Sequence, residues 1–116
     1  MKFHIFLTLA IIFFATTLVP ATEGTHAKVK EYMSGGECMI WVTDVNGKYV
    51  AGDKKFHSCD DRTTLDIDTK SNDAYFLLAT TVGELETARR GPFEGDTCFI
   101  IEGTNFSFSL NPSELC

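Results

Sequence analysis

The sequence predicts an all-β fold, a small two-sheet antiparallel β-sandwich of about six strands stapled by two disulfides. Three observations predict it: a chain of only 116 residues, four cysteines, and short β-branched and aromatic runs separated by turn residues. A chain of this length forms one domain. The core of so small a domain is marginal, so cross-links between cysteines would add stability that it needs.

Residues 1–21 have the pattern of a secretory signal peptide. Lys2 supplies the positive start, an uncharged apolar run covers 5–19, and Val19-Pro20-Ala21 offers small residues for cleavage after Ala21. The alternative is a transmembrane anchor, but a span needs roughly 20 apolar residues and this run is shorter. We therefore expect a secreted protein that is not held in the membrane after cleavage.

The charge and the missing motifs exclude several classes of function. The chain has 16 Asp and Glu against 10 Lys and Arg, a net charge of −6. An acidic surface argues against a nucleic-acid binder and against a cationic membrane-lytic peptide. The sequence has no G-x-S-x-G, H-E-x-x-H or phosphate-loop motif. We therefore expect no cofactor, no catalytic residues and no enzymatic activity.

An even number of cysteines in a short secreted domain is typical of a disulfide framework. The four cysteines are Cys38, Cys59, Cys98 and Cys116. Two disulfides are expected, and the residues themselves leave three connectivities open. A metal site is not expected, because there is no C-x-x-C pair and the mature chain has only His26 and His57.

In the first half of the chain, residues 22–36 are expected to be an N-terminal lead-in to a disulfide-stapled domain at 37–116. The strand-like run 39–43 is followed by Asn46-Gly47, which predicts a hairpin with a type I′ turn to a strand at 48–51. Residues 56–58 are expected to be a short strand. Residues 63–68 alternate, with Leu65 and Ile67 on one face.

In the second half, the mostly apolar run 75–81 predicts a central strand. The segment 84–90 fits a strand or a single helical turn, and Gly91-Pro92 is expected to stop it. Further strands are expected at 97–102 and 105–110. The predicted core side chains are Trp41, Leu77, Phe99, Ile101, Phe106 and Phe108.

This arrangement resembles the MAX effectors, the Magnaporthe avirulence and ToxB-like proteins of plant-pathogenic fungi. The resemblance rests on the signal peptide, on Cys38-Met39-Ile40-Trp41-Val42 before Asn46-Gly47, on Asp96-Thr97-Cys98-Phe99-Ile100-Ile101, and on a tail that ends in Cys116. It covers most of 37–116. Family members have two three-stranded antiparallel sheets bridged by a disulfide between the early and the later cysteine.

The resemblance implies a Cys38–Cys98 bridge, which leaves Cys59–Cys116 as the second pair. The separation between Cys38 and Cys98 is longer than this family usually shows, and Val82–Gly95 is the candidate insertion. The resemblance also implies a secreted virulence factor that binds a host plant protein. Some family members enter host cells, and some are bound by plant immune receptors.

The sequence offers one local acid–base candidate, His57 beside Asp60 or Asp61, which would suit nuclease-like chemistry. A polar turn next to Cys59 is the interpretation we favour. The chain also has five aspartates that could bind calcium, but their spacing lacks the glycine and the terminal Glu of an EF-hand, so a solvated acidic face is expected. These are Asp60, Asp61, Asp66, Asp68 and Asp73.

Two further motifs concern modification. Asn105-Phe106-Ser107 is an N-glycosylation sequon if Asn105 is exposed, whereas Asn111-Pro112-Ser113 is excluded by its proline. Arg89-Arg90 resembles a dibasic processing site, although an exposed loop is the favoured interpretation.

The function expected from the sequence is that of a secreted, monomeric effector that binds a host protein. One alternative is an extracellular disulfide-stapled inhibitor or ligand-binding module with Arg89-Arg90 on its inhibitory loop. The other is a small secreted hydrolase that uses His57. A sandwich of this size can bind a partner by adding a strand to an exposed sheet edge. The expected edge is Lys48–Gly52 or Thr63–Asp68.

Overall fold

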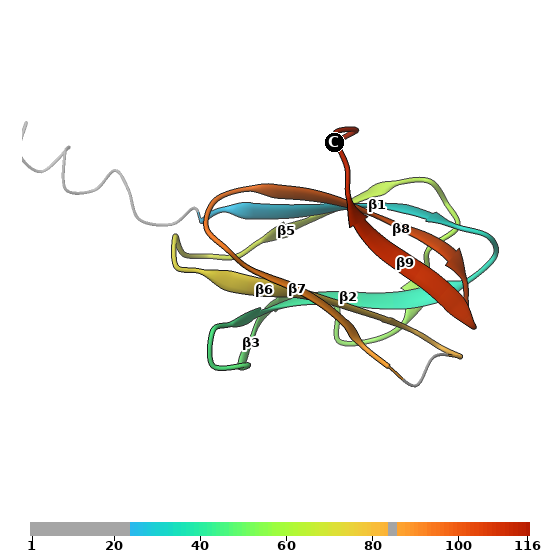
Figure 1. The fold of residues 1–116 in the computed structure, drawn as a ribbon, viewed down its shortest axis with the longest axis horizontal. Coiled ribbons are helices and arrows are strands. Elements are labelled where there is room, and N and C mark those ends of the chain that lie inside the picture. Colours follow the sequence, from blue (N-terminus) through green and yellow to red (C-terminus); the bar gives the residue numbers. More distant parts are fainter. Residues whose placement is uncertain (1–23, 84–85) are drawn as a thin grey trace, which may run out of the picture.

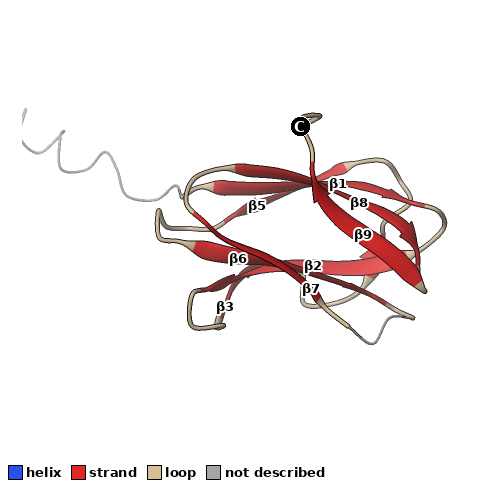
Figure 2. Ribbon diagram, in the orientation of Figure 1, coloured by secondary structure: helices blue, strands red, loops and turns tan. Residues whose placement is uncertain are grey.

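The computed structural model of the chain describes residues 24–83 and 86–116, and every regular element in these ranges is a strand (Figures 1 and 2). The strands form two facing sheets with two disulfides, which confirms the predicted two-sheet all-β fold. The predicted signal peptide, 1–21, lies outside the described residues. Within the described ranges, no helix has the length and apolar character needed to cross a membrane.

The described part contains nine strands, more than the sequence predicts. The strands are β1 His26–Met33, β2 Glu37–Asp44, β3 Tyr49–Gly52, β4 His57–Ser58, β5 Thr64–Asp68, β6 Tyr75–Thr81, β7 Ala88–Phe93, β8 Thr97–Thr104 and β9 Ser107–Pro112.

Sheet A has the strand order β5-β1-β8-β9, with β1 antiparallel to β5 and parallel to β8. The prediction of a lead-in at 22–36 was therefore wrong, because most of this segment is a central strand, and the sandwich is not purely antiparallel. Three of the four inward side chains of β1 are apolar, namely Ala27, Val29 and Met33. The fourth is Glu31, and this charge at a core position interrupts the apolar alternation in the sequence.

Sheet B has the order β3-β2-β6-β7, and β4 also pairs with β2. The strand β6 is central and has the predicted bounds. The strand β7 resolves the ambiguous segment as a strand from Ala88 onward and continues through Gly91-Pro92, where a stop was expected. An edge strand tolerates proline, because half of its N–H groups face away from the sheet.

The hairpin between β2 and β3 is confirmed, but its predicted turn type was wrong. A type I′ turn needs positive φ at both Asn46 and Gly47, and only Gly47 has it, at 87°. The Asp44 carboxylate instead accepts hydrogen bonds from the backbone N–H groups of Asn46 and Lys48, each at 2.9 Å. Backbone bonds between Asp44 and Lys48 and between Gly47 and Asp44 close this wider turn.

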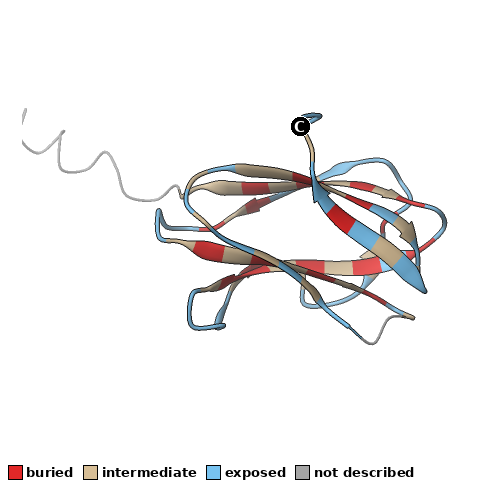
Figure 3. Cartoon of the chain, viewed as in Figure 1, coloured by how far each residue is buried: buried red, intermediate tan, exposed pale blue. Residues whose placement is uncertain are grey.

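The core lies between the two sheets and takes alternate residues from each (Figure 3). Leu77, Phe99 and Ile101 are buried as predicted, and Phe108 packs partly against them. Trp41 was wrongly assigned to the core, because its neighbours on β2 face inward and it lies half-buried on the other face. Phe106 was also wrongly assigned: it lies in the β8–β9 turn and is 79% exposed.

The disulfides are Cys38–Cys59 and Cys98–Cys116, so the pairing implied by the family resemblance was wrong. The alternation of β8 explains why. Phe99 and Ile101 face the core, so Cys98 faces the outside of sheet A and cannot reach Cys38, which is fully buried between the sheets. The first disulfide therefore ties the chain after β4 to β2, and the second ties the tail to the outer face of β8.

Tryptic mapping of the denatured, unreduced chain tests this connectivity. Cleavage after every Lys and Arg places both Cys98 and Cys116 in the peptide 91–116, whereas Cys38 lies in 31–48 and Cys59 in 56–62. The expected products are a cross-linked pair, 31–48 with 56–62, and a separate peptide 91–116 with an internal disulfide. Either of the other two connectivities would join all three peptides into one species.

Candidate functional site

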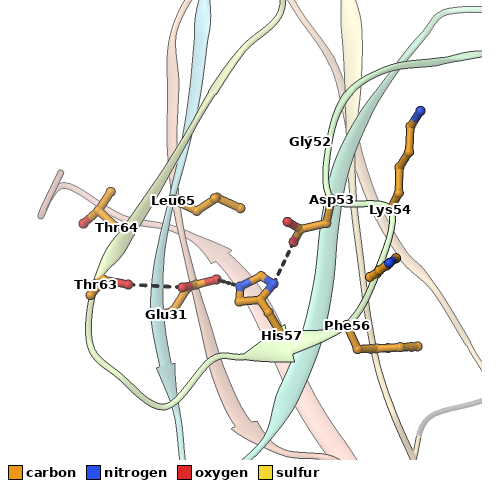
Figure 4. Close-up of a pocket in the computed structure, with 10 residues that line it drawn as sticks. Glu31, Gly52, Asp53, Lys54, Phe56, His57, Thr63, Thr64 and Leu65 are labelled. Atoms are coloured by element: carbon orange, nitrogen blue, oxygen red, sulfur yellow. Dashed lines mark hydrogen bonds and ion pairs between the residues drawn. The ribbon is translucent and has the colours of Figure 1, made fainter.

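An open pocket of about 680 Å³ on one side of the sandwich gathers several reactive side chains (Figure 4). It lies beside the end of β3, the β3–β4 connection, β4 and the start of β5. Its lining residues are Glu31, Gly52, Asp53, Lys54, Lys55, Phe56, His57, Thr63, Thr64 and Leu65.

Glu31 is the buried acid of this pocket, with only 3% of the residue exposed. A carboxylate in a protein core costs free energy unless its oxygens are hydrogen-bonded. Both oxygens of Glu31 are: Oε2 accepts a short hydrogen bond from His57 Nε2, and Oε1 accepts one from Thr63 Oγ1 at 3.2 Å. The Glu31 side chain on β1 in sheet A is therefore hydrogen-bonded directly to His57 on β4 in sheet B.

The other ring nitrogen of His57 also has an acidic partner. His57 Nδ1 lies 3.1 Å from Asp53 Oδ2, so the ring sits between two carboxylates (Figure 4). Asp53 is held in place because the same Oδ2 accepts a hydrogen bond from the backbone N–H of Ile40 at 2.9 Å. An imidazole with a carboxylate at each nitrogen is suited to the doubly protonated, positively charged form.

The acids next to His57 in sequence form the polar turn that the sequence analysis favours, and they are not the hydrogen-bond partners of His57. Asp60 accepts a hydrogen bond from Ser58 Oγ at 2.6 Å, and Asp61 lies 3.0 Å from Thr63 Oγ1, whose single proton it shares with Glu31. Both are exposed and serve their own turn. The spacing of Asp53 and His57 at i and i+4 was visible in the sequence, but nothing local indicated Glu31, which lies 26 positions from His57.

Burial of the Glu31 carboxylate raises its pKa above the usual 4.5, although the hydrogen bond from His57 acts in the opposite direction. Burial of the His57 ring favours its neutral form, but the hydrogen bond and charge of Glu31 and the charge of Asp53 outweigh burial and raise its pKa above 6.5. The folded chain therefore holds protons at this pair more tightly than the unfolded chain does.

This arrangement is better suited to holding two sheets together than to acid–base catalysis. A general acid or base must exchange its proton with a substrate within hydrogen-bond reach. Both nitrogens of His57 already face a carboxylate, so a substrate would have to displace Glu31 or Asp53 first.

The other candidate acids do not converge on one site. Asp66 pairs with His26 Nδ1 at 2.7 Å, and Asp68 accepts hydrogen bonds from the backbone N–H groups of Lys70 and Gly24. The backbone N–H of Asp73 donates to Ser71 Oγ. Within the part of the chain that the structure describes, none of these aspartates joins a group of possible metal ligands, in line with the expected acidic face.

Asn105, in the glycosylation sequon, is half-buried in the β8–β9 turn. Its side-chain oxygen accepts a hydrogen bond from the backbone N–H of Glu37 at 3.0 Å, and its carbonyl accepts one from Thr81 Oγ1 at 2.6 Å. Asn105 therefore connects this turn to sheet B. The Nδ2 atom, to which a glycan is attached, takes no part in these two bonds.

Arg89-Arg90 lies within β7 and not in the exposed loop that was expected. Arg90 Nε donates to the carbonyl of Leu110 at 3.1 Å, so it connects β7 to β9 across the sandwich. The Arg89 guanidinium lies 4.6 Å from the ring centre of Phe76. A protruding inhibitory loop therefore does not carry these arginines.

Both of the segments offered as a possible edge are edge strands. In the described part of the chain, β3 pairs only with β2, and β5 pairs only with β1. A second hollow, of about 460 Å³, runs between β3 and β5 and shares Gly52, Asp53, Lys54 and Leu65 with the first. The two edges thus border one continuous groove.

Comparison with known proteins adds no relative: no family model, curated protein or solved structure matches the chain.

Replacing Glu31 with alanine tests its role in joining the sheets. The change removes the acceptor of His57 Nε2 and one of the two acceptors of Thr63 Oγ1, so we expect the free energy of unfolding to fall by about 1–3 kcal/mol. Glu31→Gln keeps an acceptor oxygen and is the matched control, with a smaller loss. Urea denaturation measures both, and equal stability of Glu31→Ala and the wild type would contradict this role.

The raised pKa values of Glu31 and His57 both make the folded chain less stable as the pH rises. The Glu31 contribution is complete below about pH 4.5 and the His57 contribution below about pH 6.5, and each is lost as the pH rises above those values. We expect the urea midpoint to fall between about pH 6 and about pH 8. His57→Gln should flatten this fall, and an unchanged slope would assign it to another group.

Proposed function

We propose that this protein is a secreted effector that binds a partner protein by pairing its free strand β5 with an extended segment of that partner. The supporting observation is that β5 is an edge strand beside an open groove. An added strand gains affinity from backbone hydrogen bonds and specificity from alternate side chains.

The hydrogen-bonding pattern of β5 identifies the groups that are available. Glu31 N–H donates to the Thr63 carbonyl, and Thr69 N–H donates to the Thr25 carbonyl. Because hydrogen-bonded pairs alternate in an antiparallel ladder, Leu65 and Ile67 point their backbone groups toward β1. The backbone N–H and C=O groups of Thr64, Asp66 and Asp68 therefore face the free edge.

The other edge beside the groove is less suitable for docking. The strand β3 has four residues, and the Gly52 carbonyl already accepts a hydrogen bond from the Tyr49 hydroxyl at 2.5 Å. The β3 and β5 strands approach each other where the Ile67 side chain lies beside Gly52. Strand β5 offers the longer and more accessible row of backbone groups.

The charges beside this edge indicate the chemistry of the partner. Asp66 and Asp68 alternate along β5 on the face opposite Ile67, in a chain with a net charge of −6. Opposite charges at facing positions of neighbouring strands stabilise the pair. We infer that the partner segment is extended and carries lysine or arginine at alternate positions.

The host-plant part of the proposal rests on the resemblance to MAX effectors. The signal-peptide pattern and the order of cysteines, predicted strands and turns along the sequence support it. The Cys38–Cys59 pairing, however, differs from that family's bridge between sheets. Disulfides are compatible with the expected secretion. Partner binding is therefore argued from the edge strand, independently of the family.

The occupied ring of His57 and the strand position of Arg89-Arg90 make a hydrolase and a loop-type protease inhibitor less suitable alternatives.

Asp66→Pro tests the docking edge. Proline removes an N–H group that faces away from β1, so the fold keeps its ladder while an incoming strand loses a donor and meets the proline ring. We expect affinity for the partner to fall at least about tenfold. Asp66→Ala is the matched control, because it keeps the N–H and loses only the carboxylate, so it should weaken binding less than the proline does.

The measurement uses the full chain secreted from a yeast host, immobilised and exposed to leaf extract, with cross-linking to locate contacts. Proteins that are retained by the wild type, retained more weakly by Asp66→Ala, lost by Asp66→Pro and cross-linked beside β5 support the proposal. Leaf infiltration with the same three proteins should follow the same order of response. Equal retention by Asp66→Pro would exclude this edge as the docking site.

A further inference from the structure

We propose that Glu31, Cys38, His57 and Cys59 form a redox-gated site for a tetrahedral Zn²⁺ ion, closed while the Cys38–Cys59 disulfide is intact and opened by its reduction. One potential ligand atom from each residue lies within 4.8 Å of the other three. This inference does not depend on the docking edge of β5.

The geometry of the donor atoms fits such an ion. Cys59 Sγ lies 3.4 Å from Glu31 Oε2 and 3.4 Å from His57 Nε2. Tetrahedral zinc with bonds of about 2.0–2.3 Å places its ligands about 3.3–3.8 Å apart. Cys38 Sγ lies within 4.8 Å of the other ligand atoms. The direct contact between His57 and Glu31, and the covalent bond between the two sulfurs, would have to lengthen.

The orientation of His57 also suits a metal ligand. A zinc-binding histidine usually donates its second ring N–H to a carboxylate, which fixes the tautomer and aims the other nitrogen at the metal. Asp53 occupies that position, 3.1 Å from Nδ1, while Nε2 points toward Cys59 and Glu31. The outer-shell partner of a His–Zn unit is therefore already in place.

The chemistry of opening is a thiol–disulfide exchange. A dithiol reductant supplies two electrons, the sulfur–sulfur bond breaks, each cysteine sulfur takes a proton, and the reductant becomes a disulfide. Zn²⁺ then displaces the two thiol protons and the proton held between Glu31 and His57, all of which pass to solvent. Two thiolates, an imidazole and a carboxylate are ligands that zinc prefers.

The second disulfide is a natural contrast. Cys98 and Cys116 lie on the outer face of sheet A, and the contacts of their sulfurs are with the backbone N–H of Cys116 and the carbonyl of Lys28. Among the described residues, no histidine or carboxylate joins this pair in a group of metal ligands. Reduction alone therefore should not create a site there.

Cobalt titration of the reduced full chain tests the proposal, because tetrahedral Co²⁺ with thiolate ligands has characteristic visible absorption. The test protein is the double variant Cys98→Ala/Cys116→Ala, reduced under anaerobic conditions, and its counterpart is Cys38→Ala/Cys59→Ala. We expect the tetrahedral spectrum only in the first, its loss on adding Zn²⁺, and no such spectrum before reduction.

Ligand variants separate a built site from two thiols in an unfolded chain. His57→Gln and Glu31→Gln in the first protein should each weaken Co²⁺ binding by more than about tenfold. In the reduced wild type, Zn²⁺ should raise the unfolding temperature, and it should leave the oxidised protein unchanged. Absence of a tetrahedral spectrum, or equal affinity in His57→Gln, would overturn the proposal whether or not the variants remain folded.

Discussion

The hydrogen bond between Glu31 and His57 is the contact on which the arrangement of the sheets most depends. It joins a core position of β1 in sheet A to β4 in sheet B, and the Cys38–Cys59 disulfide lies directly beside it. Burying a carboxylate is acceptable only because both oxygens are paired and the imidazole opposite it can carry a positive charge. The Cys38–Cys59 disulfide and the Glu31–His57 pair thus both stabilise the segment where the chain passes from sheet B to sheet A.

This crossing also determines where the open edge lies. Residues 59–63 leave β4, are held to β1 by backbone hydrogen bonds to Glu31 and Met33, and then enter β5. Strand β5 consequently lies at the outside of sheet A with one row of backbone groups unpaired. The groove beside it has the buried acid and histidine at one end and alternating aspartates along the strand. The Glu31–His57 hydrogen bond and the β5 edge proposed to bind a partner therefore lie at the two ends of the same connection between β4 and β5.

The two disulfides differ in surroundings although their loops are similar in length, 21 and 18 positions. Cys38 and Cys59 are fully buried beside a carboxylate and an imidazole, whereas Cys98 and Cys116 lie near the surface and secure the tail. A chain-entropy argument assigns the two bridges about the same stabilisation, roughly 3 kcal/mol each. Their chemistry differs because of neighbouring side chains that loop length does not describe.

The sequence alone determined the class of fold, most strand positions and the two edges, because alternation, turn residues and cysteine count are local properties. Strand 75–81 and the Leu65–Ile67 face are examples, since a period of two residues is visible within one strand. Tertiary structure decided the role of β1, the pairing of the cysteines and the partners of His57. Each depends on which face of a strand meets which face of another far along the chain. The buried Glu31 also interrupts the apolar pattern of β1, and only the tertiary structure shows that His57 is its partner.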